Sequence, residues 1–453
     1  MFRRLLVANR GEVAVRVARA ARELGIAPVG VASRADLGAA WLAVMDEVVC
    51  IGGAAAAESY LALESVVQAA VQTGCSALHP GWGFLAENPR LAALAEQHGV
   101  TFVGPPAGVM QRMALKWPAK RAMSAAGLDV VPGSNGTLDD VDQAAAVAGE
   151  VGYPVLLKAD AGGGGRGMRR CADESELREG FPAASAEARA AFGDGRLYLE
   201  RFLAGGRHVE VQLLVDRFGA AIHLGERECS IQRKHQKLIE ESPSPALDAR
   251  ERRELGERAA RAAAAIGYVG AGTIEFLRDP ADGKLLFMEM NARLQVEHPV
   301  SEEVSGVDVV REQLSIAANA ALGRTQADVR LRGHALECRI NAEDPARGFR
   351  PSPGRITAFE FPLDRGPGRV RLDTHLAAGE EVSPHYDSLV AKVITWGESR
   401  ELALETMQRC LAGARVEGIA TTIPLHLAVL ASARFRAGDY DTADIPGFSP
   451  ASA

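Results

Sequence analysis

Apolar residues change their spacing along the first thirty residues of the chain. A short apolar run at residues 4–9 predicts a strand, and apolar side chains then recur at helical spacing over residues 13–24. Gly25 ends the predicted helix, and a second apolar run at residues 26–32 predicts another strand. Strand–helix–strand units of this kind are typical of the start of a parallel α/β sheet.

The same pattern continues as far as residue 103. Further strands are predicted at residues 48–51, 77–78 and 101–103, and helices at residues 61–73 and 89–98. The repetition predicts a first α/β domain that closes before Gly104. An alanine-rich helical stretch follows, and Pro118 is expected to interrupt it.

The remainder of the chain mixes strands and helices in irregular order. Strands are predicted at residues 154–158, 197–202 and 208–215, with a strand-rich stretch at residues 271–297. Helices are predicted at residues 183–192, 250–266, 307–322 and, as the last element, 401–412. From His334 onward, short apolar runs between prolines and glycines favour short strands and turns.

The composition is that of an ordinary globular protein. The 453 residues are 47% hydrophobic and 24% charged, which suits about three domains and excludes a disordered chain, a collagen or a small disulfide scaffold. The net charge, 51 basic minus 58 acidic residues, is −7, so nothing favours binding to nucleic acid or to a membrane surface. No apolar run approaches the roughly 18 residues that a membrane-spanning helix needs. The N-terminus does not fit a secretory leader, and six singly spaced cysteines favour reduced thiols, so we expect a cytoplasmic protein.

A glycine-rich segment occupies residues 161–168, and Lys158 lies on the strand that leads into it. Consecutive glycines let backbone N–H groups approach phosphate oxygens without steric hindrance. Residues 162–167 also satisfy Gly-x-Gly-x-x-Gly, but a dinucleotide-binding turn requires a following helix, and a strand is predicted here. A P-loop is excluded because no Lys-Ser/Thr follows the last glycine. A phosphate-binding flap between two strands and a flexible structural loop both remain possible interpretations.

Polar residues alternate with apolar residues over positions 289–297. In an extended segment, one face carries all five polar side chains: Glu289, Asn291, Arg293, Gln295 and Glu297. A hairpin with residues 273–277 would place Glu275 on the same face, opposite or diagonal to Glu289. Two such carboxylates repel each other unless a cation lies between them, and Mg²⁺ prefers one or two carboxylates together with phosphate oxygens. The pattern therefore indicates a metal site at Glu275 and Glu289. It is followed along the same face by Arg293 as an anion clamp, the amide of Gln295 and Glu297 as a candidate base. An amphipathic strand with one solvated face is the alternative.

Residues 226–237 are dense in charge and short of apolar side chains. A solvated face and a surface that supplies cations and amides to a triphosphate are both compatible with this composition. The ten histidines and six cysteines show no zinc-site spacing, and no Gly-x-Ser-x-Gly elbow occurs. Phosphoryl chemistry is therefore favoured over metal hydrolase or serine hydrolase chemistry.

Eight strings taken together resemble biotin carboxylase, the ATP-grasp component of biotin-dependent acyl-CoA and pyruvate carboxylases. They follow in order over practically the whole chain: ANRGE at 8–12, HPGWGFLAEN at 79–88, LKADAGGGGRGMR at 157–169, RHVEVQ at 207–212, ERECSIQRKHQK at 226–237, EMNARLQVEHPV at 289–300, ECRINAEDP at 337–345 and HYDSLVAK at 385–392. One string alone is a weak signal, whereas eight in sequence are highly specific.

The resemblance implies a multidomain architecture of α/β and α+β type in three parts. A pre-ATP-grasp α/β domain is expected at residues 1–115 and a two-lobed ATP-grasp domain at residues 116–330. Its small lobe, at about residues 131–203, would carry the glycine flap. A β-rich C-terminal domain is expected at residues 331–448.

The resemblance also implies a reaction: ATP and bicarbonate carboxylate N1 of carrier-bound biotin through carboxyphosphate, with Mg²⁺ or Mn²⁺. The residues implied to hold the nucleotide are Lys116, Lys158, Gly163, Gly164, Gly165, Gly167, Glu200, Arg201, Leu203, His208, Gln232, His235 and the cation Lys237. The implied metal ligands are Glu275, Glu289 and Asn291. The implied roles in the chemistry are bicarbonate binding by Arg293, Gln295 and the Val296 backbone, general base for Glu297, enolate stabilisation for Arg339 and biotin-pocket wall for Trp82.

Some positions depart from the common pattern of that family. The departures are Trp82 in place of Tyr, Ala114-Leu115 in place of Gly-Asp before Lys116, Trp117-Pro118 after it, Asp160 at a position that is usually small, and Ala292 in place of Thr. None of them removes a charged group that the implied mechanism requires.

The expected partners follow from the same resemblance. The chain contains no biotin-acceptor motif and no carboxyltransferase, so we expect a separate subunit of an acetyl-CoA or propionyl-CoA carboxylase, acting with a biotin carboxyl carrier protein and carboxyltransferase subunits. A homodimer is implied, with Arg16, Arg19 and Glu23 at the matching positions, although Arg19 and Glu23 could form only a surface pair. Two alternative functions are another ATP-grasp ligase, such as a carbamoyl-phosphate-synthetase-like enzyme, and a catalytically silent nucleotide-binding paralogue.

Overall fold

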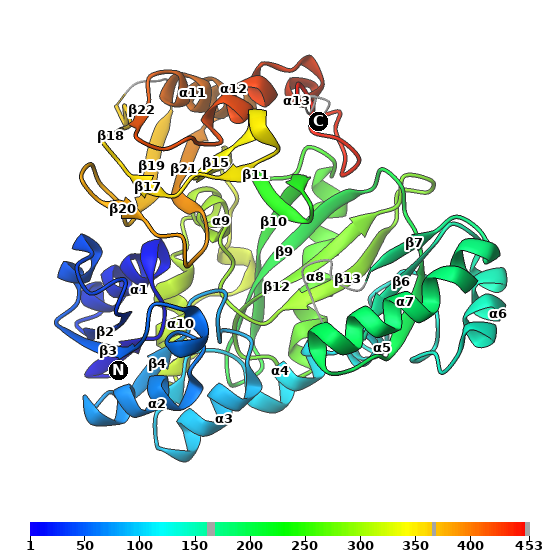
Figure 1. Ribbon diagram of the computed structural model, residues 1–453, viewed down its shortest axis with the longest axis horizontal. Helices are drawn as coiled ribbons and strands as arrows, with labels where there is room; N and C mark the ends of the chain where they lie inside the picture. Colours follow the sequence, from blue (N-terminus) through cyan, green and yellow to red (C-terminus); the bar gives the residue numbers. More distant parts are fainter. Residues whose placement is uncertain (161–167, 365–367, 449–453) are drawn as a thin grey trace.

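The computed structural model describes residues 1–160, 168–364 and 368–448 (Figure 1). The glycine-rich segment, including Gly163, Gly164, Gly165 and Gly167, lies outside the described residues. The chain begins with a parallel sheet in the order β3-β2-β1-β4-β5, as the alternating apolar runs predict. Its strands are β1 (Arg4–Val7), β2 (Ala27–Ser33), β3 (Glu47–Gly52), β4 (Ala77–His79) and β5 (Thr101–Phe102). Its helices are α1 (Gly11–Glu23), α2 (Leu63–Gln72) and α3 (Pro89–Gln97).

Two helices connect this sheet to the rest of the molecule. Helix α4 spans Ala107–Ala114, and α5 spans Lys116–Ala125. The alanine-rich stretch is interrupted as expected, but at Leu115, three residues before Pro118, so that Pro118 falls in the first turn of α5. In the first turn of a helix the N–H that proline lacks has no intrahelical partner in any case.

A small lobe contains a three-stranded antiparallel sheet in the order β7-β6-β8. Its elements are α6 (Val141–Val151), β6 (Val155–Ala159), β7 (Arg169–Cys171), α7 (Glu174–Phe192) and β8 (Leu197–Arg201). Helix α7 begins nine residues earlier than the predicted helix at 183–192. The side chain of Asp173 caps this earlier start by accepting the N–H of Glu176, and the helix accommodates Pro182 in its interior. Apolar side chains of both helices pack on the sheet as one core.

An eight-stranded antiparallel sheet forms the centre of the molecule, in the order β13-β12-β9-β10-β11-β14-β21-β19 (Figure 1). Its strands are β9 (Arg207–Val215), β10 (Ala221–Arg233), β11 (Gln236–Ser242), β12 (Gly270–Arg278), β13 (Leu285–Asn291), β14 (His334–Asn341), β19 (Arg369–Thr374) and β21 (Leu389–Gly397). Helices α8 (Ala249–Ala265), α9 (His298–Ser305) and α10 (Val309–Ala317) contact it. The hydrogen-bonded pairing of β11 with β14 carries this sheet across the boundary expected at residues 330/331.

The C-terminal region adds short strands and three helices. The strands are β15 (Glu343–Asp344), β16 (Arg350–Pro351), β17 (Gly354–Arg355), β18 (Ala358–Glu360), β20 (Glu381–Val382) and β22 (Arg415–Glu417). The helices are α11 (Arg400–Ala412), α12 (Ile423–Ala431) and α13 (Ala433–Ala437). The expectation that the helix at 401–412 is the last element is therefore wrong. The run that α12 forms is short and apolar around much of its circumference, so its periodicity is weak.

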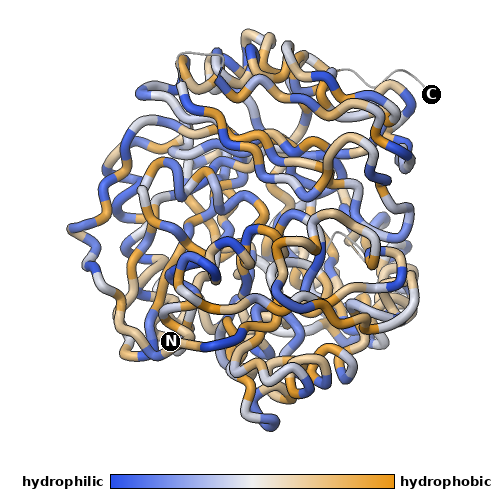
Figure 2. The backbone as a smooth tube through the Cα atoms, turned by 90° about the vertical axis from the view of Figure 1, so that its left-hand side faces the viewer, coloured by the Kyte–Doolittle hydropathy of each residue, from blue (hydrophilic) through white to orange (hydrophobic). Residues whose placement is uncertain are grey.

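The apolar residues are distributed over several cores. In Figure 2 the apolar stretches along the tube are short and broken by polar residues. Among the described residues, no helix combines the length and the apolar character needed to cross a membrane.

Candidate active site

A single cavity of about 1040 Å³ collects the predicted site residues. It lies between the central sheet, strand β14 included, and the small lobe. The described residues proposed from the sequence all line it: Trp82, Lys116, Lys158, Glu200, Arg201, Leu203, His208, Gln232, His235, Lys237, Glu275, Glu289, Asn291, Arg293, Gln295, Val296, Glu297 and Arg339. Residues that are up to 257 positions apart in the chain thus share one site, while their individual roles remain predictions.

The hairpin of β12 and β13 places the two candidate metal carboxylates together. Glu275 and Glu289 are direct partners in the antiparallel register, as expected. The expectation that the extended segment continues to Glu297 is wrong, because β13 ends at Asn291 and Glu297 occupies the N-cap position of α9. A turn therefore brings Glu297 back toward the cavity, which a straight strand would not do.

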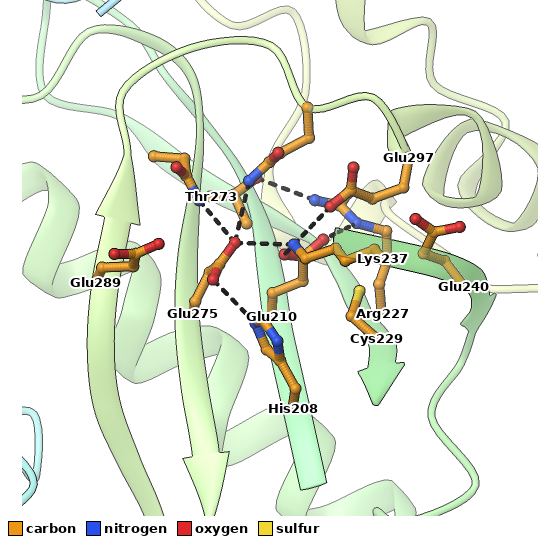
Figure 3. Close-up of polar contacts among 12 residues, drawn as sticks. His208, Glu210, Arg227, Cys229, Lys237, Glu240, Thr273, Glu275, Glu289 and Glu297 are labelled. Carbon is orange, nitrogen blue, oxygen red and sulfur yellow. Dashed lines mark hydrogen bonds and ion pairs between the residues drawn. The ribbon is translucent and has the colours of Figure 1, made fainter. Parts of the chain in front are cut away.

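An ammonium group at the centre of the cavity holds three carboxylates together. Lys237 Nζ lies 2.6 Å from Glu210, 2.8 Å from Glu275 and 2.7 Å from Glu297 (Figure 3). Burial favours the neutral amine, but the three carboxylates raise the pKa of Lys237 well above its ordinary value. Burial likewise opposes ionisation of Glu275, yet Lys237 and His208 lower its pKa below 4.5. These groups are therefore charged and mutually compensated at neutral pH.

Two buried residues beneath this cluster were missed by the sequence reasoning. Arg227 is fully buried and donates to Glu210 at 2.6 Å, to Gln212 at 2.7 Å and to Ser301 at 2.9 Å. Burial alone would raise the pKa of Glu210, but Arg227 and Lys237 lower it to about 2. The sequence did carry a signal for both residues, because the charged strings RHVEVQ and ERECSIQRKHQK contain Glu210 and Arg227. The solvated-face interpretation of residues 226–237 is wrong for its first half, which is buried.

A second cation contacts Glu297 from strand β14. Arg339 donates to Glu297 at 2.8 Å and, through Nε, to Glu240 at 2.6 Å. Burial and the Glu210 carboxylate both favour protonated Glu297, but Lys237 and Arg339 hold its pKa below 4.5. Burial raises the pKa of Glu240 to about 7 despite the opposing charge of Arg339. Glu297 is thus ionised between two cations and carries no proton of its own, as a general base requires.

The guanidinium of Arg293 lies at the outer side of the same cluster. It donates to Glu87 at 3.0 Å, to Gln295 at 2.9 Å and to Asn291 at 3.2 Å. The amides of Gln295 and Asn291 in turn donate to Glu275, at 3.3 Å and 2.7 Å. Glu87 was not among the predicted residues, although it lies within the string HPGWGFLAEN. The arrangement presents a guanidinium and an amide side by side, as an anion site requires.

The donor set at the base of the hairpin fits a hard divalent cation. Glu275, Glu289 and Asn291 supply two carboxylates and an amide oxygen on one cavity wall, the ligand type that Mg²⁺ takes beside phosphate oxygens. In this structure Glu289 pairs with Lys116, which lowers the pKa of the carboxylate to about 2. Two further groups could hold a metal by ligand type alone: His208, Glu210 and Glu275, and Glu210, Cys229 and Glu297. Lys237 neutralises a carboxylate of every one of these sets, Glu275 of the hairpin included. The hairpin set fits Mg²⁺ better because its ligands are all oxygens, whereas the other two sets include a histidine or a cysteine.

The small lobe contributes a second charged group to the cavity. Glu200 is buried between Lys120, at 2.9 Å, and Lys158, at 2.5 Å. Lys120 was missed from the sequence because it lies on α5, far from the glycine-rich segment. Arg201 pairs with Asp279. Glu200 therefore holds two lysines in place at the cavity wall that the small lobe provides.

The other described residues predicted to bind the nucleotide also line the cavity. Gln232 lies 3.5 Å from the ring of His208, and His208 contacts Glu275 at 2.9 Å. Burial lowers the pKa of His208, but Glu275 raises it above its ordinary value overall. His235 is exposed in the turn between β10 and β11, and Leu203 is half-buried after β8. These placements leave room in the cavity between the two lobes.

A buried chain of polar contacts connects Trp82 with the turn before α9. The indole Nε1 of Trp82 donates to Glu12 at 3.0 Å, and Glu12 lies 3.2 Å from Lys392. The ammonium of Lys392, which is fully buried, donates to the backbone oxygen of Val296 at 2.8 Å. Lys392 was not predicted as a site residue, although it ends the string HYDSLVAK. The contacts orient the Val296 peptide next to Glu297.

Comparison with known proteins agrees with this architecture. Family models match for the biotin carboxylase N-terminal domain at residues 1–110, the carbamoyl-phosphate synthase L chain ATP-binding domain at 116–325 and the biotin carboxylase C-terminal domain at 337–446. The chain is 52% identical over 439 residues to a biotin carboxylase of Pseudomonas aeruginosa, covering 97% of this chain and 96% of that one.

Solved structures show the same similarity in three dimensions. A complex of biotin carboxylase with β,γ-ATP from Campylobacter jejuni superposes with a TM-score of 0.94 at 44% identity, covering 98% of both chains. The biotin carboxylase domain dimer of 2-oxoglutarate carboxylase from Hydrogenobacter thermophilus, in complex with MgADP, ADP and bicarbonate, gives a TM-score of 0.93 at 46% identity. It covers 98% of this chain and 96% of that one.

Proposed function

The chain belongs to the biotin carboxylase family of ATP-dependent ligases, and on that premise we propose that it carboxylates N1 of biotin with ATP and bicarbonate. One observation carries the proposal: Glu297 lies between Lys237 and Arg339, 2.7 Å and 2.8 Å away, at the edge of a cavity with room for a nucleotide. The ionised carboxylate, the two cations and the nearby Arg293 are what the activation of a small anion requires.

The phosphoryl step needs positive charge around the triphosphate of ATP. Lys116, Lys158 and Lys237 supply cations to the cavity lining, and His208, Gln232 and His235 add further polar side chains. Mg²⁺ or Mn²⁺ held by Glu275, Glu289 and Asn291 would neutralise charge on the transferring phosphoryl group. Lys116 has to leave Glu289 for the phosphates as this site fills.

Bicarbonate binds between Arg293, Gln295 and the backbone of Val296 in this proposal. Glu297 accepts the bicarbonate proton, and the bicarbonate oxygen attacks the γ-phosphorus with ADP as leaving group. Carboxyphosphate then separates into CO₂ and phosphate. The side chains of Arg293 and Gln295 already form one hydrogen-bonded unit, so little reorganisation is needed to hold the anion.

Biotin enters beside Trp82 and Arg339. The phosphate released from carboxyphosphate takes the N1 proton, which leaves negative charge on the ureido oxygen, and the Arg339 guanidinium stabilises that charge. The N1 anion then forms the new C–N bond by attack on CO₂. Hydrogen bonds to Glu240 and Glu297 keep the Arg339 guanidinium oriented at the cavity wall.

The test is turnover of purified protein with MgATP, bicarbonate and free biotin. The proposal predicts ADP formation that depends on bicarbonate and rises with biotin, together with carboxybiotin as product. ATP hydrolysis stimulated by ammonia and not by biotin would favour a carbamoyl-phosphate-synthetase-like ligase. ATP binding without bicarbonate-dependent turnover would indicate a silent paralogue, and either result refutes the proposal.

The final carboxyl acceptor we propose is an acyl-CoA, acetyl-CoA or propionyl-CoA, reached through a biotin carboxyl carrier protein and a carboxyltransferase. The support is the resemblance to biotin-dependent acyl-CoA carboxylases, with 2-oxoglutarate as the competing acceptor because the Hydrogenobacter relative is a 2-oxoglutarate carboxylase domain. Reconstitution with purified carrier and carboxyltransferase pairs, and comparison of carboxylated products, distinguishes these acceptors.

A homodimer is part of the same proposal. Arg16, Arg19 and Glu23 line a second hollow of about 500 Å³ at the surface of α1. Arg16 pairs with Glu302 at 2.8 Å within the chain, and Glu23 pairs with Arg311 at 3.3 Å. The Hydrogenobacter relative is a dimer by its description. Sedimentation of the purified chain tests whether this one dimerises.

A further inference from the structure

Helix α5, whose first residue is Lys116, begins without a capping side chain of its own. Leu115 occupies the N-cap position with extended backbone geometry and makes no side-chain cap. The first N–H groups of an α-helix have no partner within the helix and must find acceptors elsewhere. The first turn of α5 therefore depends on another part of the chain.

Asp160 supplies both missing acceptors. Its backbone carbonyl accepts the N–H of Lys116 at 3.2 Å, and its carboxylate accepts the N–H of Trp117 at 3.0 Å. The third helical residue, Pro118, has no N–H to satisfy. One residue thus completes the first turn, and its negative charge lies at the helix end that favours anions.

Asp160 is itself held firmly in the small lobe. It directly follows β6, it is 2% exposed, and its own N–H donates to the carbonyl of Arg196 at 3.0 Å. Strand β6 also carries Lys158, which faces the same cavity as Lys116. The Asp160 contacts therefore fix the start of α5 relative to the strand that precedes the glycine-rich segment.

The direction of the Lys116 side chain depends on that first turn. Its ammonium pairs with Glu289 on β13, in the central sheet, while its backbone N–H is bound to Asp160 in the small lobe. We propose that Asp160 is a positioning residue for Lys116, capping α5 from another strand so that the Lys116 ammonium points into the phosphate end of the cavity. This inference rests on the proposed function, because it assigns Lys116 to ATP.

The decisive experiment removes the cap that Asp160 provides and replaces it with a cap at Leu115. Asp160→Ala is expected to raise KM for ATP about five- to tenfold, the size of a typical N-cap contribution, and to leave KM for bicarbonate unchanged. Leu115→Asp places a carboxylate at the N-cap itself, where it can accept the same Trp117 N–H. The double variant Leu115→Asp/Asp160→Ala is expected to return KM for ATP to within about twofold of wild type. Asp160→Asn, which retains an acceptor, should stay close to wild type.

A matched control separates positioning from a general loss of helix capping. Asp173→Ala removes the cap of α7 in the same lobe, where the carboxylate accepts the Glu176 N–H at 2.9 Å, and should leave KM for ATP unchanged. An unchanged KM for ATP in folded Asp160→Ala overturns the inference, as does a double variant whose KM stays raised. If Asp160→Ala is too unstable to assay, the double variant decides alone, and its failure to fold counts against the inference.

Equilibrium binding of MgATP to the wild-type protein distinguishes this inference from the proposed function. Wild-type protein that does not bind ATP refutes the proposed function. Wild-type protein that binds ATP, with Asp160→Ala binding it equally well, refutes only the role of Asp160.

Discussion

The substitution Glu297→Gln removes one negative charge from the centre of the site while keeping its shape. The wild-type carboxylate is 1% exposed and contacts Lys237 at 2.7 Å and Arg339 at 2.8 Å. Loss of a positioned general base lowers turnover by about 10²- to 10⁴-fold. We expect carboxylation to fall by that factor and ATP binding to remain.

The cost in stability should be modest despite the burial. Removing one partner of a buried ion pair costs about 3–5 kcal/mol when the other charge is left alone. Here Lys237 keeps Glu210 and Glu275, and Arg339 keeps Glu240. The negative charge of Glu297 also helps to raise the pKa of Glu240, so its removal favours ionised Glu240. We therefore expect Glu297→Gln to lower the free energy of unfolding by about 1–2 kcal/mol, which leaves the variant folded.

The assay combines three measurements on the same preparation: carboxybiotin formation, equilibrium binding of MgATP, and the free energy of unfolding in urea. Glu257→Gln, the same chemical change on the exposed side of α8, serves as control and should match wild type. Because Lys237 and Arg339 hold the pKa of Glu297 below 4.5, the base is already ionised at neutral pH and wild-type turnover should not rise through this group above about pH 6. Wild-type turnover in folded Glu297→Gln would show that the base has been assigned to the wrong residue.

Three further outcomes are expected. Glu289→Gln should weaken the use of MgATP by about tenfold or more through the loss of a metal ligand, and an unchanged Mg²⁺ titration would remove it from the metal site. Lys392→Met should raise KM for bicarbonate severalfold by releasing the Val296 peptide while KM for ATP stays the same, and steady-state kinetics with each substrate varied checks this. Burial opposes ionisation of Glu241, but the hydrogen bonds and charges of His334 and Arg400 lower its pKa from 4.5 to about 2. The ionised Glu241 carboxylate stabilises the folded protein by about 3 kcal/mol above pH about 4.5, and this contribution is lost as the pH falls toward 2. The free energy of unfolding, measured as a function of pH in acid, should therefore fall less steeply in Glu241→Gln than in wild type.

Local sequence patterns were enough for much of the fold. The parallel N-terminal sheet followed from alternating apolar runs because each strand and helix there has its own clear period. The direct pairing of Glu275 with Glu289 followed from hairpin geometry for the same reason. Many of the residues that line the cavity could be named in advance, because the eight strings resemble one family.

Only the tertiary structure decided how charge is compensated in that cavity. Period-two alternation predicted one straight face from Glu289 to Glu297, whereas the chain turns after Asn291 and brings Glu297 onto Lys237. Arg227, Asp160 and Lys392 contact Glu210, Trp117 and Val296, which lie 17, 43 and 96 residues away in the chain, and no local pattern encodes these pairs. Periodicity reports which face of an element is buried, because burial is a property of each element in turn. The partner of a buried charge is set by which distant segments the folded chain brings within hydrogen-bonding distance.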